Sequence, residues 1–273
     1  MSIIVLDNSR FIAILRLVPS NFLWCNALGI LMKSKIPLNE KSSINQIRER
    51  FDGDVERFST LETGQQSAID AVLILDLVAK CAAANLHNGA RILDIGCGAG
   101  NFTLRILAEC TPLNCVLVDL SQPMLDRALS RVQETTTGTV ETKQSDMRDL
   151  AFEPKSFDCI VAGQVMHHLR NDADWEQMFT KLHKWLKPNG VLFIADLITL
   201  DDPAMQAILQ NKYEEHLTEV GGEEYRDKVL VYIDAEDSPR SLKFQMEILA
   251  KVGFSDYDVL HRNSLFGAYF ARK

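Results

Sequence analysis

The chain has 273 residues, of which 47% are hydrophobic and 24% are charged. This balance is typical of a folded globular protein and excludes collagen, a coiled coil or disorder as the main architecture. With 29 basic and 37 acidic residues the net charge is −8, so no global basic surface for nucleic acid or anionic lipid is present.

The first 43 residues are predicted to be an N-terminal extension, either disordered or partly upstream of the true start. Residues 1–31 are apolar but interrupted by charges. They contain neither the about 20 apolar residues that a membrane span needs nor a clear signal-peptide cleavage site. Met32 opens a more ordinary stretch, so we consider it an alternative start.

The six cysteines form no CxxC pair, and no histidine cluster lies at zinc spacing along the chain. We therefore expect reduced thiols, no bound metal and a cytoplasmic location.

From residue 44 onward, two helices precede a regular alternation of strands and helices. Apolar spacing predicts the helices at 44–58 and 66–84. Strands are predicted at 91–95, 115–119, 140–143, 157–162 and 191–195, with intervening helices at 100–110, 122–133 and 173–187 and a turn at Pro188-Asn189-Gly190. This order predicts a parallel α/β sheet with helices on both faces.

Residues 201–252 interrupt this order and are predicted to be a helical cap insertion. Asp202-Pro203 marks the start of a helix, and Gly221-Gly222 marks a break before further helix up to Gly253. Between 201 and 247 there are 12 acidic and 5 basic residues, so this insertion holds most of the net negative charge. An acidic cap suits a small buried acceptor and argues against nucleic acid as a substrate. Residues 254–261 and 265–272 then alternate like a closing antiparallel pair.

A glycine-rich turn follows the first strand of this alternation, within Ile92–Gly100. Glycines at a strand-to-helix turn let a ligand approach the backbone, and the helix N-terminus offers free N–H groups. Asp119 ends the second strand, where a carboxylate can accept hydrogen bonds from ribose hydroxyls.

The charge and the glycine spacing of this turn favour S-adenosylmethionine over NAD as the ligand. Asp94 precedes the first glycine, where it would repel the pyrophosphate of NAD and attract the ammonium of a methionine moiety. The glycine spacing is GxGxG, whereas the dinucleotide fingerprint is GxGxxG. A cationic nucleoside such as S-adenosylmethionine is therefore the predicted cofactor.

Residues after the third and fourth strands complete the predicted cofactor site. Asp146 can bond an adenine amino group while Met147 packs against the ring, and Gly163-Gln164 lies at the carboxyl edge of the sheet. Residues 51–70 are expected to fold over the cofactor. The predicted cofactor-binding residues are Asp94, Gly96, Cys97, Gly98, Gly100, Asp119, Leu120, Ser121, Asp146, Met147, Gly163 and Gln164.

Together with Leu186-Lys187-Pro188-Asn189-Gly190, these motifs resemble the class I S-adenosylmethionine-dependent methyltransferases over about 90–200 and 254–272. The resemblance implies a doubly wound, Rossmann-like sheet of seven strands, mostly parallel, with the last strand antiparallel. In a narrower resemblance, Phe51–Phe58 is similar to the FDxxVxxF opening of the carboxy-S-adenosylmethionine synthases of tRNA wobble-uridine modification. In those enzymes an insertion arginine holds the extra carboxylate, and Arg226 is the nearest match.

Methyl transfer mainly requires alignment of the acceptor and exclusion of water, and it needs a base only when the acceptor must lose a proton. His167 and His168 follow the fourth strand, where either one can serve as that base or simply shape a loop. The candidate catalytic residues are therefore His167, His168 and Arg226.

These observations predict a methyltransferase for a small-molecule acceptor, a monomer or homodimer with no membrane partner. Four alternatives stay open: a carboxy-S-adenosylmethionine synthase-like enzyme, direct methylation of tRNA or protein, a non-catalytic cofactor-binding module, and an NAD-dependent oxidoreductase.

Overall fold

The computed structural model describes residues 36–60 and 65–273. Most of the predicted N-terminal extension, including the alternative start at Met32, lies outside the described residues. Within the described part, no helix is both long enough and apolar enough to cross a membrane.

Seven strands form one sheet in the order β3-β2-β1-β4-β5-β7-β6. They are β1 (Arg91–Ile95), β2 (Asn114–Asp119), β3 (Val140–Gln144), β4 (Phe157–Gly163), β5 (Leu186–Leu197), β6 (Asp256–Asn263) and β7 (Phe266–Arg272). Strands β1 to β5 pair in parallel, and β7 pairs antiparallel with both β5 and β6. The predicted seven-stranded, mostly parallel sheet with an antiparallel last strand is confirmed.

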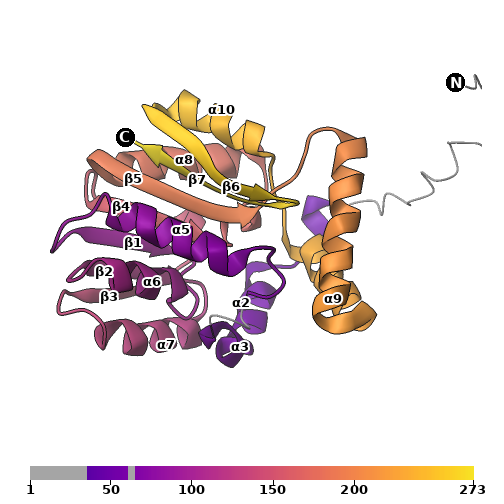
Figure 1. Cartoon of the computed structure of the whole chain (residues 1–273), viewed down its shortest axis with the longest axis horizontal. Coiled ribbons are helices and arrows are strands. Elements are labelled where there is room, and N and C mark those ends of the chain that lie inside the picture. Colours follow the sequence, from indigo (N-terminus) through magenta and orange to yellow (C-terminus); the bar gives the residue numbers. More distant parts are fainter. Residues whose placement is uncertain (1–35, 61–64) are drawn as a thin grey trace, which may run out of the picture. The chain divides into compact units, whose positions relative to one another are not determined.

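Helices cover both faces of this sheet (Figure 1). The first face packs against α5 (Ala71–Ala83), α6 (Asn101–Glu109) and α7 (Gln122–Gln133), and the second against α8 (Asp172–Trp185) and α10 (Leu242–Val252). Successive residues of a strand face opposite sides, so Ile92 belongs to the first core while Leu93 belongs to the second. The near-continuous apolar strands of the sequence are explained by burial on both faces.

The N-terminal helices are shorter than the sequence predicts. The predicted helix 44–58 is broken into α2 (Ile44–Asp52) and α3 (Val55–Ser59), because Gly53 caps the first with its N–H bonded to Glu49 O. The predicted helix 66–84 begins only at Ala71, since Asp70 has a left-handed φ of 58°.

The junction of α8 and β5 also differs from the prediction. The helix ends at Trp185, and β5 already begins at Leu186. The predicted turn is present inside the strand as an irregularity, with Asn189 at φ 63° and a register shift between Phe157 and Cys159 of β4.

The predicted cap insertion resolves into two helices with different roles. Helix α9 (Pro203–Glu236) is capped by Asp202, bends at the non-helical Gly222, and ends well before the predicted Gly253. The residues between α9 and α10 are not helical, and α10 packs with α8 on the sheet. Only α9, orange in Figure 1, stands beyond one end of the strands, near α2 and α3.

Candidate active site

One pocket lies at the carboxyl ends of the parallel strands. Its floor is formed by the glycine-rich turn after β1 and by the residues that follow β2, β3 and β4. Residues of α2, α3 and α9 supply the opposite wall. This is the edge at which open α/β sheets bind their ligands.

The turn after β1 is fixed by its own backbone. Gly96, Gly98 and Gly100 all have positive φ, at 67°, 51° and 86°. A Cβ on Gly96 would lie 2.5 Å from the Val165 side chain, whereas a Cβ on Gly98 would meet no described atom within 4 Å. Gly98 thus leaves open space at the pocket wall, where a ligand can approach the backbone.

Asp119 ties this turn to the end of β2. Its Oδ2 accepts a hydrogen bond from Gly98 N at 2.8 Å, and its Oδ1 accepts one from Ser121 N at 2.9 Å. Burial raises the pKa of Asp119 although these N–H groups oppose the shift. The carboxylate lines the pocket and has further lone pairs available for ribose hydroxyls.

Asp146 lines the same wall but is already engaged. Its Oδ2 accepts a hydrogen bond from Arg148 Nη2 at 2.6 Å, and its Oδ1 accepts one from Arg148 N at 2.8 Å. Burial alone would raise the pKa of Asp146, but Arg148 outweighs it and lowers the value. An adenine amino group would therefore share this carboxylate with Arg148.

Asp94 lies behind the pocket wall rather than on it. The side chain is 1% exposed, and its Oδ2 accepts a hydrogen bond from Thr103 Oγ1 at 2.7 Å. Its Oδ1 is buried and finds no hydrogen-bond partner among the described residues. Burial raises the pKa of Asp94 to about 7.

The structure brings most of the predicted site residues to the pocket. The lining residues among them are Gly96, Cys97, Gly98, Asp119, Leu120, Asp146, Met147, Gly163, Gln164, His167 and His168. Asp94, Gly100 and Ser121 lie behind this surface: Gly100 packs against α7 and Ser121 caps that helix. Arg226 is on α9 away from the lining residues, with its Nε 2.9 Å from Asp227 Oδ1.

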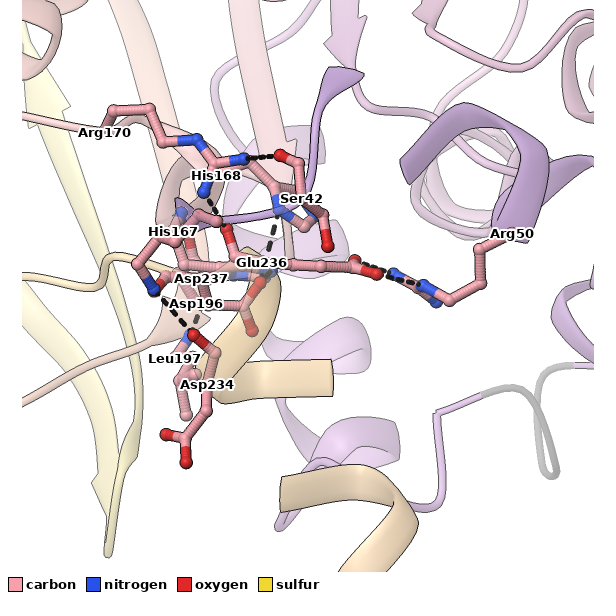
Figure 2. Close-up of polar contacts among 11 residues, drawn as sticks. Ser42, Arg50, His167, His168, Arg170, Asp196, Leu197, Asp234, Glu236 and Asp237 are labelled. Carbon is pink, nitrogen blue, oxygen red and sulfur yellow. Dashed lines mark hydrogen bonds and ion pairs between the residues drawn. The ribbon is translucent and has the colours of Figure 1, made fainter. Parts of the chain in front are cut away.

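His167 and His168 meet two carboxylates at the inner end of the pocket (Figure 2). The Nδ1–H of His167 donates to Asp196 Oδ1, and the backbone N of His167 donates to Asp196 Oδ2 at 3.0 Å. On the other side, His167 Nε2 lies 3.7 Å and His168 Nδ1 lies 3.3 Å from Asp237 Oδ1. One carboxylate therefore comes from the end of β5 and the other from the end of α9.

The two imidazoles have opposite protonation tendencies. Burial would lower the pKa of His167, but the charges of Asp196 and Asp237 raise it to about 9. Burial, His167 and Arg50 together lower the pKa of His168 well below its ordinary value. Burial also raises the pKa of Asp237 to about 6. Without a ligand, His167 is an imidazolium at neutral pH, so His168 is the neutral member of the pair.

The end of α9 is held in place by residues from distant parts of the chain. Arg50 of α2 forms a two-pronged pair with Glu236, at 2.8 Å and 2.5 Å. Arg170 donates to the carbonyl oxygens of Glu236 and Ser42, both at 2.7 Å, and Ser42 N donates to Ala235 O at 2.9 Å (Figure 2). These contacts fix Asp237 against the histidine pair.

Sequence reasoning did not assign several residues of this wall to the site. Arg50, in the last turn of α2, was assigned no role from the sequence, and Asp237 belonged to no motif. Arg57, Tyr213 and Tyr232 also line the pocket. The only signal for the tyrosines was their place in the predicted cap.

Comparisons with known proteins agree on the family. A sequence family described as a methyltransferase domain matches residues 92–190. Phosphoethanolamine N-methyltransferase 1 of Arabidopsis thaliana is 30% identical over 56% of this chain, which spans only 31% of that protein's length. A carboxy-S-adenosyl-L-methionine synthase of Vibrio parahaemolyticus is 26% identical over 73% of this chain and 82% of its own length.

Solved structures agree on the fold. Human N-acetylserotonin methyltransferase in complex with S-adenosylmethionine aligns with a TM-score of 0.57 and is 14% identical to this chain. The alignment covers 85% of this chain and 59% of the human protein, so it extends beyond the matched family segment. Residues 92–190 are therefore a methyltransferase domain, and the glycine turn and the strand-end carboxylates lie in a fold that this chain shares with an S-adenosylmethionine-bound methyltransferase.

Proposed function

We propose that this chain transfers a methyl group from S-adenosylmethionine to a small-molecule acceptor bound between the sheet edge and α9. The main observation behind the proposal is that most of the expected cofactor residues and the histidine pair line one and the same pocket. The same pocket is lined by Gly98 and Asp119 at one end and by His167, His168 and Asp237 at the other.

The residues at the first end suit the cofactor. Gly98 leaves space beside the backbone, and Asp119 offers acceptors for a ribose. Met147 lines the pocket next to Asp146, where an adenine ring would find an apolar contact and a carboxylate. The Oδ1 of Asp94, which lies behind the glycine-rich turn, has no described hydrogen-bond partner. It is the acceptor that we expect the ammonium group of the methionine moiety to use.

The residues at the second end suit a small acceptor with an apolar body. Phe51, whose ring centroid lies 6.0 Å from that of His168, and Tyr213, Tyr232 and Phe266 line the same pocket, and the histidine pair supplies polar groups. Bound S-adenosylmethionine supplies an activated methyl group. The chain's own task is then to align the acceptor and to exclude water, which α2 and α9 do from the side opposite the sheet.

The first test is native mass spectrometry of the purified chain without added cofactor, followed by identification of any released ligand and by calorimetric titration with S-adenosylmethionine. We expect release of S-adenosylmethionine or its demethylated product, or saturable binding of added cofactor. A chain that carries neither ligand and binds no added S-adenosylmethionine would contradict the proposal.

A carboxy-S-adenosylmethionine synthase-like activity is the second candidate, favoured by the high coverage of the Vibrio relative. Arg226, the residue expected to hold the extra carboxylate, is not at the pocket, but Arg50 and Arg57 line it. In the same mass measurement, a released ligand heavier than S-adenosylmethionine by one carboxylate group would favour this candidate over methyl transfer.

A further inference from the structure

Three side chains at the inner end of the pocket offer donor atoms to one common region. The donor atoms of His167, His168 and Asp237 all lie within 4.8 Å of one another. Asp237 Oδ1 lies 3.7 Å from His167 Nε2 and 3.3 Å from His168 Nδ1. Ligands that are about 2.1 Å from a tetrahedral ion lie about 3.4 Å apart. The two distances from Asp237 Oδ1 to the histidine nitrogens are therefore close to those between ligands of one ion.

One of these donors lacks a protein partner. His168 Nδ1 is buried and makes no hydrogen bond to any described residue, despite its closeness to Asp237. A buried polar atom left unpaired costs about 1 to 3 kcal/mol, so native proteins satisfy almost all of them. An ion between the two imidazoles and Asp237 would satisfy this nitrogen.

Asp196 supplies the outer support that histidine ligands usually have. It accepts a hydrogen bond from His167 Nδ1, which leaves Nε2 as the atom that faces Asp237. The carboxylate is itself held by the backbone N–H groups of His167 at 3.0 Å and Leu197 at 2.7 Å. A carboxylate–histidine–metal arrangement fixes the ring orientation and raises the basicity of the ligand.

The charges around the three donors also favour a cation. The carboxylates of Asp196 and Asp237 approach His167 from opposite sides. The nearby cations are held by acceptors other than the donor atoms of these side chains: Arg50 pairs with Glu236, Arg170 donates to backbone carbonyl oxygens, and Lys41 Nζ donates to Asp237 O at 2.5 Å. The two carboxylates consequently concentrate negative charge around the imidazole nitrogens.

We propose that His167, His168 and Asp237 form a binding site for a divalent transition-metal ion such as Zn²⁺, with Asp196 as the positioning residue. Two imidazoles and one carboxylate are a ligand set that such ions prefer. All three residues line the pocket, so the remaining coordination positions face its interior. No metal was expected because the sequence has no CxxC pair and no histidine cluster at zinc spacing, and Asp237 lies in a segment far from the two histidines.

The site also suggests a class of acceptor, and this step rests on the proposed methyl transfer. A hydroxyl oxygen bound to the ion would release its proton to solvent at a lower pH than the free hydroxyl does. The deprotonated oxygen is the better nucleophile. It would form a bond to the methyl carbon of S-adenosylmethionine as the methyl–sulfur bond breaks, and S-adenosylhomocysteine would leave. The acceptor would accordingly be a small molecule with an ionisable hydroxyl group.

The test uses the full chain without a histidine tag, freed of metal by a chelator. Zn²⁺ is titrated by calorimetry, and Co²⁺ is titrated by its visible absorption spectrum. We expect one ion per chain with a tetrahedral or five-coordinate Co²⁺ spectrum. Asp237→Asn and His168→Gln should weaken binding by at least about 100-fold, and Asp196→Asn by about 10- to 100-fold. His87→Gln, at a histidine whose side chain is 71% exposed, is the control and should bind like wild type.

Thermal melting of each variant and its affinity for S-adenosylmethionine show whether the fold is retained. Failure of the wild-type chain to bind either ion, or unchanged affinity in both Asp237→Asn and His168→Gln, would overturn the metal site. A chain that binds the ion but not S-adenosylmethionine would contradict the proposed methyl transfer and leave the metal site standing.

Discussion

The two ends of the pocket are built in different ways. At the cofactor end, backbone groups hold the site: Cys97 N bonds Val118 O at 2.9 Å, and Gly98 N bonds Asp119. At the acceptor end, side chains from remote segments hold it. Arg50 and Glu236 are 186 positions apart, and Arg170 and Ser42 are 128 positions apart.

This difference separates general from specific function. A turn fixed by its own strand and helix keeps one shape whatever the rest of the chain does, which suits a cofactor shared by a family. An end assembled from α2, the loop after β4 and α9 can change with any of these segments, which suits an acceptor that differs between relatives.

The largest effect is expected from removal of Asp119, which links the end of β2 to the glycine-rich turn after β1. Asp119→Ala deletes the acceptor of two backbone N–H groups and the predicted ribose contacts. Hydrogen bonds to a charged group contribute about 1.5 to 3 kcal/mol each, so we expect a loss of at least about 100-fold in affinity for S-adenosylmethionine. Calorimetric titration measures it.

Asp126→Ala provides the matched control for that loss. Asp126 is an exposed carboxylate on α7 that accepts a hydrogen bond from Gln122 Nε2 at 2.7 Å. Its removal should leave the affinity unchanged. Equal affinities of Asp119→Ala and Asp126→Ala would mean that the strand-end carboxylate does not bind the cofactor.

The same contrast explains what the sequence could predict. The glycine spacing and Asp119 each follow a strand that is recognisable from its apolar run, so their positions at the sheet edge were predictable. Asp146 follows the polar strand β3, which only the alternation of strands and helices indicated. The parallel order of the sheet followed from the alternation of strands and helices.

The acceptor end could not be predicted because its contacts do not repeat in sequence. Nothing in the spacing of Arg50 and Glu236 indicates that they pair, and nothing around Asp237 indicates that it faces His167. The helix breaks were missed although the contacts that end these helices are local: Gly53 N donates to Glu49 O, and Asp237 N donates to Ile233 O. Arg226 was selected from its position in the insertion alone.

The second prediction concerns the proposed acceptor end, and asks whether its stability depends on the pair between Arg50 and Glu236, which are far apart in the sequence. Glu236→Ala removes both hydrogen bonds from the Arg50 guanidinium to Glu236 and leaves it with the longer 3.9 Å pair to Asp54, and Glu236 is only 6% exposed. Breaking a buried pair costs about 3 kcal/mol or more, so the free energy of unfolding should fall by that order. Chemical denaturation measures the loss, and hydrogen exchange should rise in α2 and at the end of α9.

An exposed ion pair of the same length is the control. Arg105 Nε and Asp76 Oδ1 are also 2.5 Å apart, but both side chains are 35% exposed. Asp76→Ala should cost clearly less than Glu236→Ala, because solvent screens the Arg105–Asp76 pair. If Glu236→Ala costs no more than Asp76→Ala, the pair does not hold the acceptor end together.

A smaller effect is expected at the glycine turn, where two substitutions separate backbone strain from ligand contact. Gly98 and Gly89 have φ values of 51° and 81°, and at neither would a Cβ meet a described atom within 4 Å. Gly98→Ala and Gly89→Ala should each destabilise the fold by about 1 to 2 kcal/mol. Only Gly98 lines the pocket, so only Gly98→Ala should also weaken cofactor binding. Equal affinities in the two variants would place the cofactor away from this turn.

The smallest effect concerns the buried carboxyl behind the turn. Burial raises the pKa of Asp94 from 3.8 to about 7, so the folded chain holds this proton more tightly than the unfolded chain. The free energy of unfolding therefore decreases as the pH rises from 3.8 to about 7. Asp94→Asn removes this dependence, and its stability relative to wild type should increase by about 1 kcal/mol between about pH 6 and pH 8.

Thermal or chemical unfolding of both proteins at the two pH values measures this difference, and parallel pH profiles would contradict it. The affinity for S-adenosylmethionine should change in the opposite direction to the stability. The buried Oδ1 of Asp94 lacks a described partner, and an ammonium group is the partner that the sequence predicts. If that contact forms, Asp94→Asn stabilises the free chain at high pH yet binds S-adenosylmethionine more weakly. The ionised Asp94 would then lower the stability of the free chain but strengthen the binding of S-adenosylmethionine.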